Sequence, residues 1–407
     1  MKRIFSATSR RTLTILYCLL QGTYWVISAA EMDYAATPLL RERGFSSISI
    51  GIISGAKFLS LIFFQYFIGR FADSHKDRIS LKKIVSILTI IAIAADLALL
   101  FMPVRFVTTL VVFVIFGGTI NCVLPLIEAL SIDYMNSGLS MNYTLSRATG
   151  SLTYCVFAYL LGIWTGKLGM DFSLVFMAVV LVVFLGINLV MPKPVVMKSG
   201  NPVLVQTDVP LSVDVSEISQ DAADQGVLSQ MESPVRQVHS TGWILKNCSK
   251  YRRFLLECFF VFLGYDMNIA FLYDRVKDIG GSDSTYGLVF AMIGLFEIPV
   301  ALGFYRLMKV RGITIERLMA FFGAFCTARA FFTTISVNMT QMVLAQAFEL
   351  LGMGVFYAGS VFFVMKTVPE ADSAKGMSLI NLFAVGAAEA VAFFISGVIR
   401  DSLGVLQ

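Results

Sequence analysis

Charged residues are scarce in this chain, and the scarcity is the first constraint on its class. Only 14% of the 407 residues are Asp, Glu, Lys or Arg, whereas soluble domains carry about a quarter. Hydrophobic residues make up 57%, and the mean hydropathy is +0.76. Apolar runs of about 20 residues recur, and a helix of that length crosses about 30 Å of hydrocarbon. The sequence therefore predicts an all-α polytopic membrane protein, since a β-barrel would show short alternating segments.

Histidine and cysteine are also few, and this limits the available chemistry. The two histidines, His75 and His239, fall in predicted loops. The six cysteines have neither a disulfide framework nor metal-ligand spacing. No nucleophile–base constellation is evident, so we expect no enzymatic activity, no metal and no cofactor. Membrane topology accounts for the net charge of +5, so we expect no nucleic-acid partner.

Six apolar runs, a long polar segment and five further runs divide the chain. The expected spans are Thr12–Tyr34, Ile48–Phe71, Ile84–Pro103, Val107–Ile132, Leu145–Leu168, Phe172–Met191, Phe254–Leu272, Tyr286–Met308, Ile315–Ile335, Met339–Met365 and Met377–Ile399. We expect residues 1–191 and 251–407 to form two helical halves, joined by a disordered cytoplasmic linker at 192–250 that has too few aromatics for a core. The sequence ends where a twelfth helix would begin, so the second half is expected to lack one helix.

Lysine and arginine are unevenly distributed between the loops. They gather at the N-terminus and in the loops after even-numbered spans, including Arg70, Lys83, Arg311 and Lys366. Cytoplasmic loops carry such an excess. We therefore predict a multi-pass protein of the cell (inner) membrane, with a cytoplasmic N-terminus and a monomeric state within the lipid bilayer.

An acid and a base flank the turn between the fourth and fifth spans. Glu128 lies near the end of one span and Arg147 near the start of the next, so a hairpin places them at similar depth. An unpaired charge there would cost at least a few kcal/mol, so we expect them to pair. The pair is either structural or part of a binding site. Tyr154 follows Arg147 by two turns on the same face, with Gly150 between. Forked donors and a ring suit a polyol, although Tyr154 is as easily read as helix packing.

Further ionisable residues interrupt the apolar runs of the second half. Counting 1.5 Å per residue from the predicted turns puts Asp266, Glu297, Arg329 and Glu349 in one layer. They fix helix packing or, as we favour, line a functional site. Other buried ionisable residues are expected at Glu31, Asp33, Lys57, Asp96, Glu257 and Glu389. Between the second and third spans, Gly69 and Asp73 precede basic residues, and Asp73 is a candidate latch or part of a merely solvated loop.

These motifs resemble a known family. The six-helix plan and the Gly69-x-x-x-Asp73 loop are similar to the major facilitator superfamily, and the loop would then serve in gating. P-L-I-E-A-L followed by S-R-A-T-G-S-L-T-Y resembles the oligosaccharide:proton symporters, the group that includes lactose permease.

That resemblance implies a role for each matching residue. Glu128 and Arg147 would bind the sugar, Tyr154 would occupy the sugar-stacking position, and Asp266 would join the substrate site. Glu297 would serve both sugar and proton, and Glu349 would carry the proton beside Arg329. The sequence departs from the pattern at Gln346, where the permease has histidine, and at Val300, where it has a sugar-contacting asparagine.

The function expected from these residues is proton-coupled symport of a small polar solute, most simply a sugar or oligosaccharide, by alternating access. The partners would be a small-molecule substrate and protons. Two alternatives stay open. One is a sugar or drug exporter of the same fold. The other is a truncated, non-transporting remnant or sensor.

Overall fold

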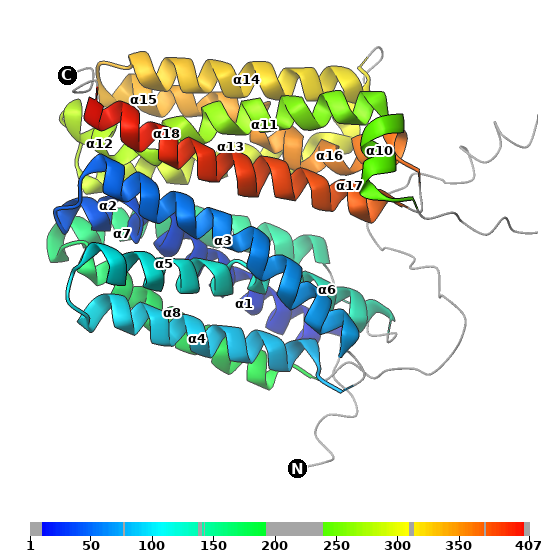
Figure 1. Cartoon of the computed structure of the whole chain (residues 1–407), viewed down its shortest axis with the longest axis horizontal. Helices are drawn as coiled ribbons and strands as arrows, with labels where there is room; N and C mark the ends of the chain where they lie inside the picture. The colour runs from blue at the N-terminus through cyan, green and yellow to red at the C-terminus, as the bar shows by residue number, and fades with distance from the viewer. Residues whose placement is uncertain are drawn as a thin grey trace, which may run out of the picture.

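The computed structural model describes residues 10–75, 78–136, 141, 143–192, 239–308, 313–369 and 372–402. Within these ranges every regular element is a helix. Two layers of roughly aligned helices lie against each other, the N-terminal half in blue to teal and the C-terminal half in green to red (Figure 1). Their apolar lengths match the thickness of a bilayer. Helices suit that environment because they satisfy their backbone hydrogen bonds internally.

The first half consists of helices that begin and end near the predicted bounds. They are α1 (Arg10–Ser28), η1 (Ala29–Tyr34), α2 (Thr37–Glu42), α3 (Ser47–Ser74), α4 (Leu81–Phe101), α5 (Phe106–Ile120), α6 (Val123–Asn136), α7 (Tyr143–Leu168) and α8 (Asp171–Val190). The start of α3 is capped by Ser46, whose side chain accepts a hydrogen bond from the Ser49 amide.

The second half follows with more interruptions. It contains α10 (Thr241–Asn247), α11 (Ser249–Ala270), α12 (Leu272–Asp278), α13 (Asp283–Met308), α14 (Ile315–Ile335), α15 (Met339–Ala345), η2 (Gln346–Leu350), α16 (Met353–Thr367), α17 (Ser373–Ile380), η4 (Asn381–Ala388) and α18 (Glu389–Ser402). The sequence predicts that the polar stretch 239–250 belongs to the disordered linker. In the structure, α10 and the start of α11 occupy this stretch. The Ser240 side chain caps α10 by accepting a hydrogen bond from the Trp243 amide. A capping serine indicates a helix start that the overall composition of the stretch does not. The linker at 193–238 lies outside the described residues.

The span prediction is confirmed by length and hydropathy. Ten described helices are long and apolar enough to cross a membrane, and the number is eleven if α11 and α12, bent by 48°, count as one span. Figure 1 shows α2 and α12 at one end of the bundle and α10 and α17 at the other. We call these the α2–α12 end and the α10 end.

Three of the long helical stretches change their winding part-way along. η1 and η4 are π-helical, and η2 is a 3₁₀ segment. Glu31 and Asp33 lie in η1, Glu349 lies in η2, and Glu389 follows η4 directly. Such irregular turns are frequent at functional sites because they redirect side chains and free backbone groups.

Polar contacts join the two halves at the α2–α12 end. Arg41 forms an ion pair with Asp274 at 2.6 Å, and Arg400 of α18 reaches the same carboxylate at 2.9 Å. Thr37 donates to the Ala270 carbonyl at 2.6 Å. Asp401 accepts from the backbone amides of Ser47 and Ile48, at the start of α3. These contacts tie α2 and α3 to α11, α12 and α18.

Two glycine crossings bring the halves even closer. At Gly162 of α7, an added Cβ would lie 2.4 Å from the Asp283 carbonyl oxygen and 3.1 Å from the Gly287 Cα. At Gly51 of α3, it would lie 2.5 Å from the Phe393 carbonyl oxygen and 3.1 Å from the Gly397 Cα. Small residues let membrane helices approach backbone to backbone, and these crossings need glycine for that reason.

Candidate functional site

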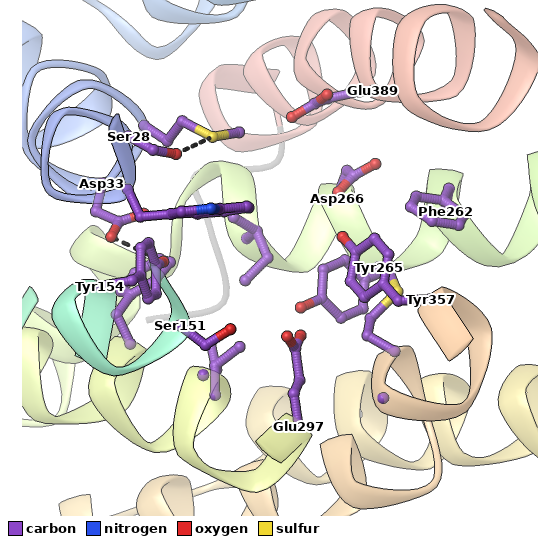
Figure 2. Close-up of a pocket in the computed structure, with 18 of the residues that line it drawn as sticks. Ser28, Asp33, Ser151, Tyr154, Phe262, Tyr265, Asp266, Glu297, Tyr357 and Glu389 are labelled. Atoms are coloured by element: carbon purple, nitrogen blue, oxygen red, sulfur yellow. Dashed lines mark hydrogen bonds between the residues drawn. The ribbon is translucent and has the colours of Figure 1, made fainter. Parts of the chain in front are cut away.

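A cavity of about 510 Å³ lies between the two halves. Figure 2 shows its walls, which come from α1, η1, α3 and α7 on one side and from α11, α13, α16 and α18 on the other. The volume falls in the range of small-molecule sites. Aromatic side chains line much of it, and its charged side chains are Asp33, Arg147, Asp266, Glu297 and Glu389.

Glu128 and Arg147 come together as the sequence predicted. Their closest oxygen and nitrogen are 3.7 Å apart, a loose ion pair that exceeds hydrogen-bond length. Each side chain is a little over one-third exposed. Arg147 lines the cavity, whereas Glu128 is described but is not among the lining residues. Glu128 is therefore linked to the cavity by its ion pair with Arg147.

Trp25 of α1 completes this corner. The Arg147 guanidinium lies 4.8 Å from the Trp25 ring centroid, in cation–π geometry. The ring fits because Gly150 lacks a side chain, since a Cβ there would lie 2.3 Å from Trp25 Cδ1. The glycine at position 150 predicts space on this face of α7 but does not identify the side chain that fills it. A tryptophan on an apolar span carries no separate signal.

Tyr154 faces the cavity on the same side of α7 as Arg147. Its hydroxyl donates to Asp33 Oδ2 at 3.0 Å, and its ring meets Trp25 edge-on at 6.3 Å between centroids (Figure 2). Asp33 is 2% exposed, and its carbonyl oxygen accepts from Tyr286 of α13 at 2.8 Å. Tyr154 is thus fixed by hydrogen bonding as well as packing.

Arg329 and Glu349 form a fully buried ion pair beside the cavity. Arg329 Nε lies 2.8 Å from Glu349 Oε1, and neither side chain is exposed. The Tyr265 hydroxyl donates to the same carboxylate oxygen at 2.8 Å. Gln346 accepts from Arg329 Nε at 2.8 Å and bonds onward to Thr333. Gln346, where the sequence departs from the resembled family, is therefore a hydrogen-bond partner of Arg329.

The remaining acids of the predicted layer face the cavity without such partners. Asp266 and Glu297 both line it. Neither has a hydrogen bond or ion pair among the described residues, and Asp266 Oδ2 is buried without a donor. Figure 2 shows Glu297 rising from α13 toward Tyr265 and Tyr357, and Asp266 on the side of Glu389. The structure thus brings the predicted layer together around one cavity and its border.

Lys57 and Glu31 form a second buried ion pair, which the sequence did not predict. Lys57 Nζ lies 2.7 Å from Glu31 Oε1, and the two side chains are 1% and 3% exposed. Both residues stood out as charges within apolar runs. The cost of an isolated charge predicts a partner for each, but not which of several acids Lys57 selects. Lys57 also fits against Gly117 of α5, where a Cβ would lie 2.2 Å from its Cγ.

The predicted gating loop lies away from the cavity. Gly69 is in α3 with open space around its Cα, and Asp73 is in the last turn of that helix. The Asp73 side chain and residues 76–77 are outside what the structure describes. The gating role of this pair therefore stays a prediction.

Comparisons with known proteins agree with this architecture. The model of the MFS_1 like family matches residues 18–406. No curated protein matches the chain. Among solved structures, nucleoside transporter NupG is similar with a TM-score of 0.69 and 15% identity, over 95% of this chain and 90% of that one. A D-xylose-proton symporter has a TM-score of 0.58 and 12% identity, over 96% and 90%.

A third structure, a variant of peptide transporter POT in complex with alafosfalin, has a TM-score of 0.63 and 15% identity, over 96% of this chain and 87% of that one. The fold and the cavity define a polytopic helical protein with a site between two halves. By its match over nearly the whole length, this chain belongs to the MFS_1 like family. The structural likenesses, all at low identity, establish the shared fold.

Proposed function

We propose that this chain is a secondary active transporter that moves a small polar solute across a membrane by alternating access. The observation that carries the proposal is the central cavity with walls from both halves. A site at such an interface becomes accessible from either side when the halves rock about it. The structural neighbours, which transport nucleosides, peptides and xylose, agree with this.

We further propose that residues 1–191 and 251–407 are the rocking halves. In the present conformation the contacts of Arg41, Asp274, Arg400 and Asp401 hold the α2–α12 end together. Opening that end would require these contacts to break. The Lys and Arg distribution supports a cytoplasmic α10 end in the cell (inner) membrane, with a monomer as the transporting unit.

The proposed solute is polar, with a sugar or oligosaccharide as the simplest fit. Arg147 offers forked donors, Glu297 offers acceptors, and Tyr154 with Trp25 supplies ring surfaces along the same wall. Asp266 lies across the cavity. Glu128 would contribute by holding Arg147 in place. An exporter of the same fold remains the second candidate, since the same cavity serves either direction.

We propose that Glu349 carries the coupled proton and that Arg329 controls its release. The carboxylate lies next to the cavity wall that bears Glu297, and it is held by Arg329 and Tyr265. A buried carboxyl favours the protonated form when its arginine moves away and the ionised form when the arginine returns. Rearrangement of α14 against η2 during transport would therefore bind and release a proton.

The test uses proteoliposomes with an imposed pH gradient. In Glu349→Gln the neutral amide keeps a polar contact with Tyr265 but cannot release a proton. Uphill accumulation of a labelled sugar should stop, while exchange of the sugar across the membrane should persist. Glu316→Gln is the matched control, because Glu316 pairs with Lys366 at the start of α14, away from the cavity.

Unchanged uphill uptake by Glu349→Gln would remove this residue from the proton path. Absence of gradient-driven and exchange transport in the wild-type protein, for every solute class tested, would instead favour a non-transporting sensor. Solute loss from loaded vesicles against its own gradient would identify the exporter.

A further inference from the structure

The walls of the cavity carry more acids than bases, and the surplus is not neutralised by neighbouring residues. The acids that line the cavity or pair with a base beside it are Glu31, Asp33, Glu128, Asp266, Glu297, Glu349 and Glu389, and the bases are Lys57, Arg147 and Arg329. Each base is already paired, Lys57 with Glu31, Arg147 with Glu128 and Arg329 with Glu349. The remaining acids, Asp33, Asp266, Glu297 and Glu389, line the cavity and form no ion pair with a described residue.

Two of these acids, Asp266 and Glu389, stand together on one wall. Asp266 is 7% exposed and Glu389 is 8% exposed, yet both line the cavity. They come from α11 and α18, and Figure 2 shows the two carboxyls facing the same space. Neither accepts a hydrogen bond or forms an ion pair among the described residues, and Asp266 Oδ2 is buried with no donor. Unpartnered buried carboxyls are rare because their desolvation is uncompensated.

Aromatic rings flank the same two carboxyls. Phe262 lies one turn before Asp266 on α11, and Phe393 lies one turn after Glu389 on α18. Residues four apart share a helix face, and both rings line the cavity. Carboxylates combined with aromatic faces are the elements with which proteins bind ammonium groups. The other aromatic–cation contacts at the cavity are made by protein side chains, Trp25 by Arg147, Tyr265 by Arg329 and Phe58 by Lys57.

We infer that the transported solute is cationic, with an ammonium group bound between Asp266 and Glu389. This inference rests on the proposed transport function and narrows its substrate class. The rest of the solute is polar and extends toward Arg147 and Glu297, so an aminated polyol or amino sugar fits the whole cavity. A neutral sugar would leave both carboxyls without a counter-charge. Protonation of the pair without a cationic solute is the competing reading, and the test separates the two.

The experiment measures binding by titration calorimetry on the purified full-length protein at pH 7. The probes are N-methyl-D-glucamine, which is a cationic polyol, its neutral counterpart D-sorbitol, and choline, which keeps its charge at every pH. The glucamine should bind at least roughly tenfold more tightly than sorbitol. Asp266→Asn and Glu389→Gln should each weaken glucamine binding by roughly tenfold and should weaken sorbitol binding by a smaller factor.

Glu257→Gln is the matched control, since it removes an acid from the same helix α11 at a site beside Gly323 and outside the cavity. It should bind the glucamine as the wild-type protein does. A melting curve for each variant separates loss of binding from loss of folding. Choline should compete with the glucamine in the wild-type protein, because the shared feature of the two probes is the charge.

Three results would overturn the inference. Equal or tighter binding of sorbitol would do so, as would undiminished glucamine binding in both folded neutralising variants. Absence of binding by either cation at millimolar concentration would do so as well. Gradient-driven uptake of a neutral sugar alongside any of these results leaves the proposed transport function standing. Cation binding without transport would instead uphold the inference and contradict the transport function.

Discussion

The Arg329–Glu349 pair allows a stability prediction with a defined magnitude. Both side chains have no exposed surface, and their charged atoms are 2.8 Å apart. In Arg329→Met the apolar volume is largely kept, but Glu349 retains only Tyr265 as a side-chain donor. Removing one partner of a buried pair costs about 3–5 kcal/mol, because the other charge is left unpaired. We therefore expect Arg329→Met to be strongly destabilised.

The double variant Arg329→Met/Glu349→Leu tests the physical reason. It removes both charges, and apolar replacement of a whole buried pair is neutral or stabilising in many proteins. About 1 kcal/mol shifts the melting temperature of a domain of 150–250 residues by about 2–4 °C. The single variant should therefore melt roughly 6 °C or more below the wild type, and the double variant should recover most of that loss while transporting nothing.

Thermal unfolding in one detergent, followed by scattering or a thiol dye, measures these shifts. Arg253→Met, at an exposed position in the first turns of α11, is the control and should melt within about 1 °C of the wild type. If the double variant were as unstable as Arg329→Met, the loss would come from packing or from the arginine's contact with Gln346, and the unpaired-charge reasoning would be refuted.

Three further predictions follow from the same structure. Arg147→Ala and Glu128→Ala should abolish solute binding without loss of membrane insertion, and unchanged affinity in Arg147→Ala would place the site elsewhere. Gly150→Ala should displace Trp25, because its Cβ would lie 2.3 Å from that ring, and should weaken binding more than Gly186→Ala on α8, where nothing lies within 4 Å. The third concerns Asp372, at the start of α17. Burial acts to raise the pKa of Asp372, but hydrogen bonds from His239 and Lys375 outweigh it and hold that pKa below its ordinary value. A lowered pKa means that this contact stabilises the fold above about pH 4 and is lost as the pH falls through the lowered pKa. The difference in melting temperature between wild type and Asp372→Asn should therefore shrink below about pH 4, and a constant difference would contradict this.

Hydropathy and the cost of buried charge were sufficient to predict much of the fold. Span positions follow from apolar length, and α14 begins and ends at the predicted Ile315 and Ile335. The Glu128–Arg147 contact follows from a hairpin that sets two charges at one depth. The same depth argument placed Arg329 level with Glu349, and the two are in contact.

The rest depends on which faces of distant helices meet, and no local pattern encodes that. Lys57 pairs with Glu31 rather than with Asp33 or Glu389, a choice made by the packing of α3 against η1 and α5. None of η1, η2 and η4 contains a proline, so no helix-breaking residue of that kind marks their changes of winding in the sequence. Trp25 belongs to the site because α1 packs on Gly150 of α7, a contact that no pattern within either span indicates.

Under the proposed alternating access, the contacts at the α2–α12 end would set a limit on turnover. If the cavity is to open there, Arg41 and Arg400 must leave Asp274, and the helices must part at Gly162 and Gly51. Every additional 1.4 kcal/mol in that closed interface, if absent from the transition state for opening, slows the step by about tenfold. A variant chosen for high melting temperature at this end would therefore be a slow transporter. The strength of this interface is consequently a compromise between the lifetime of one conformation and the speed of the cycle.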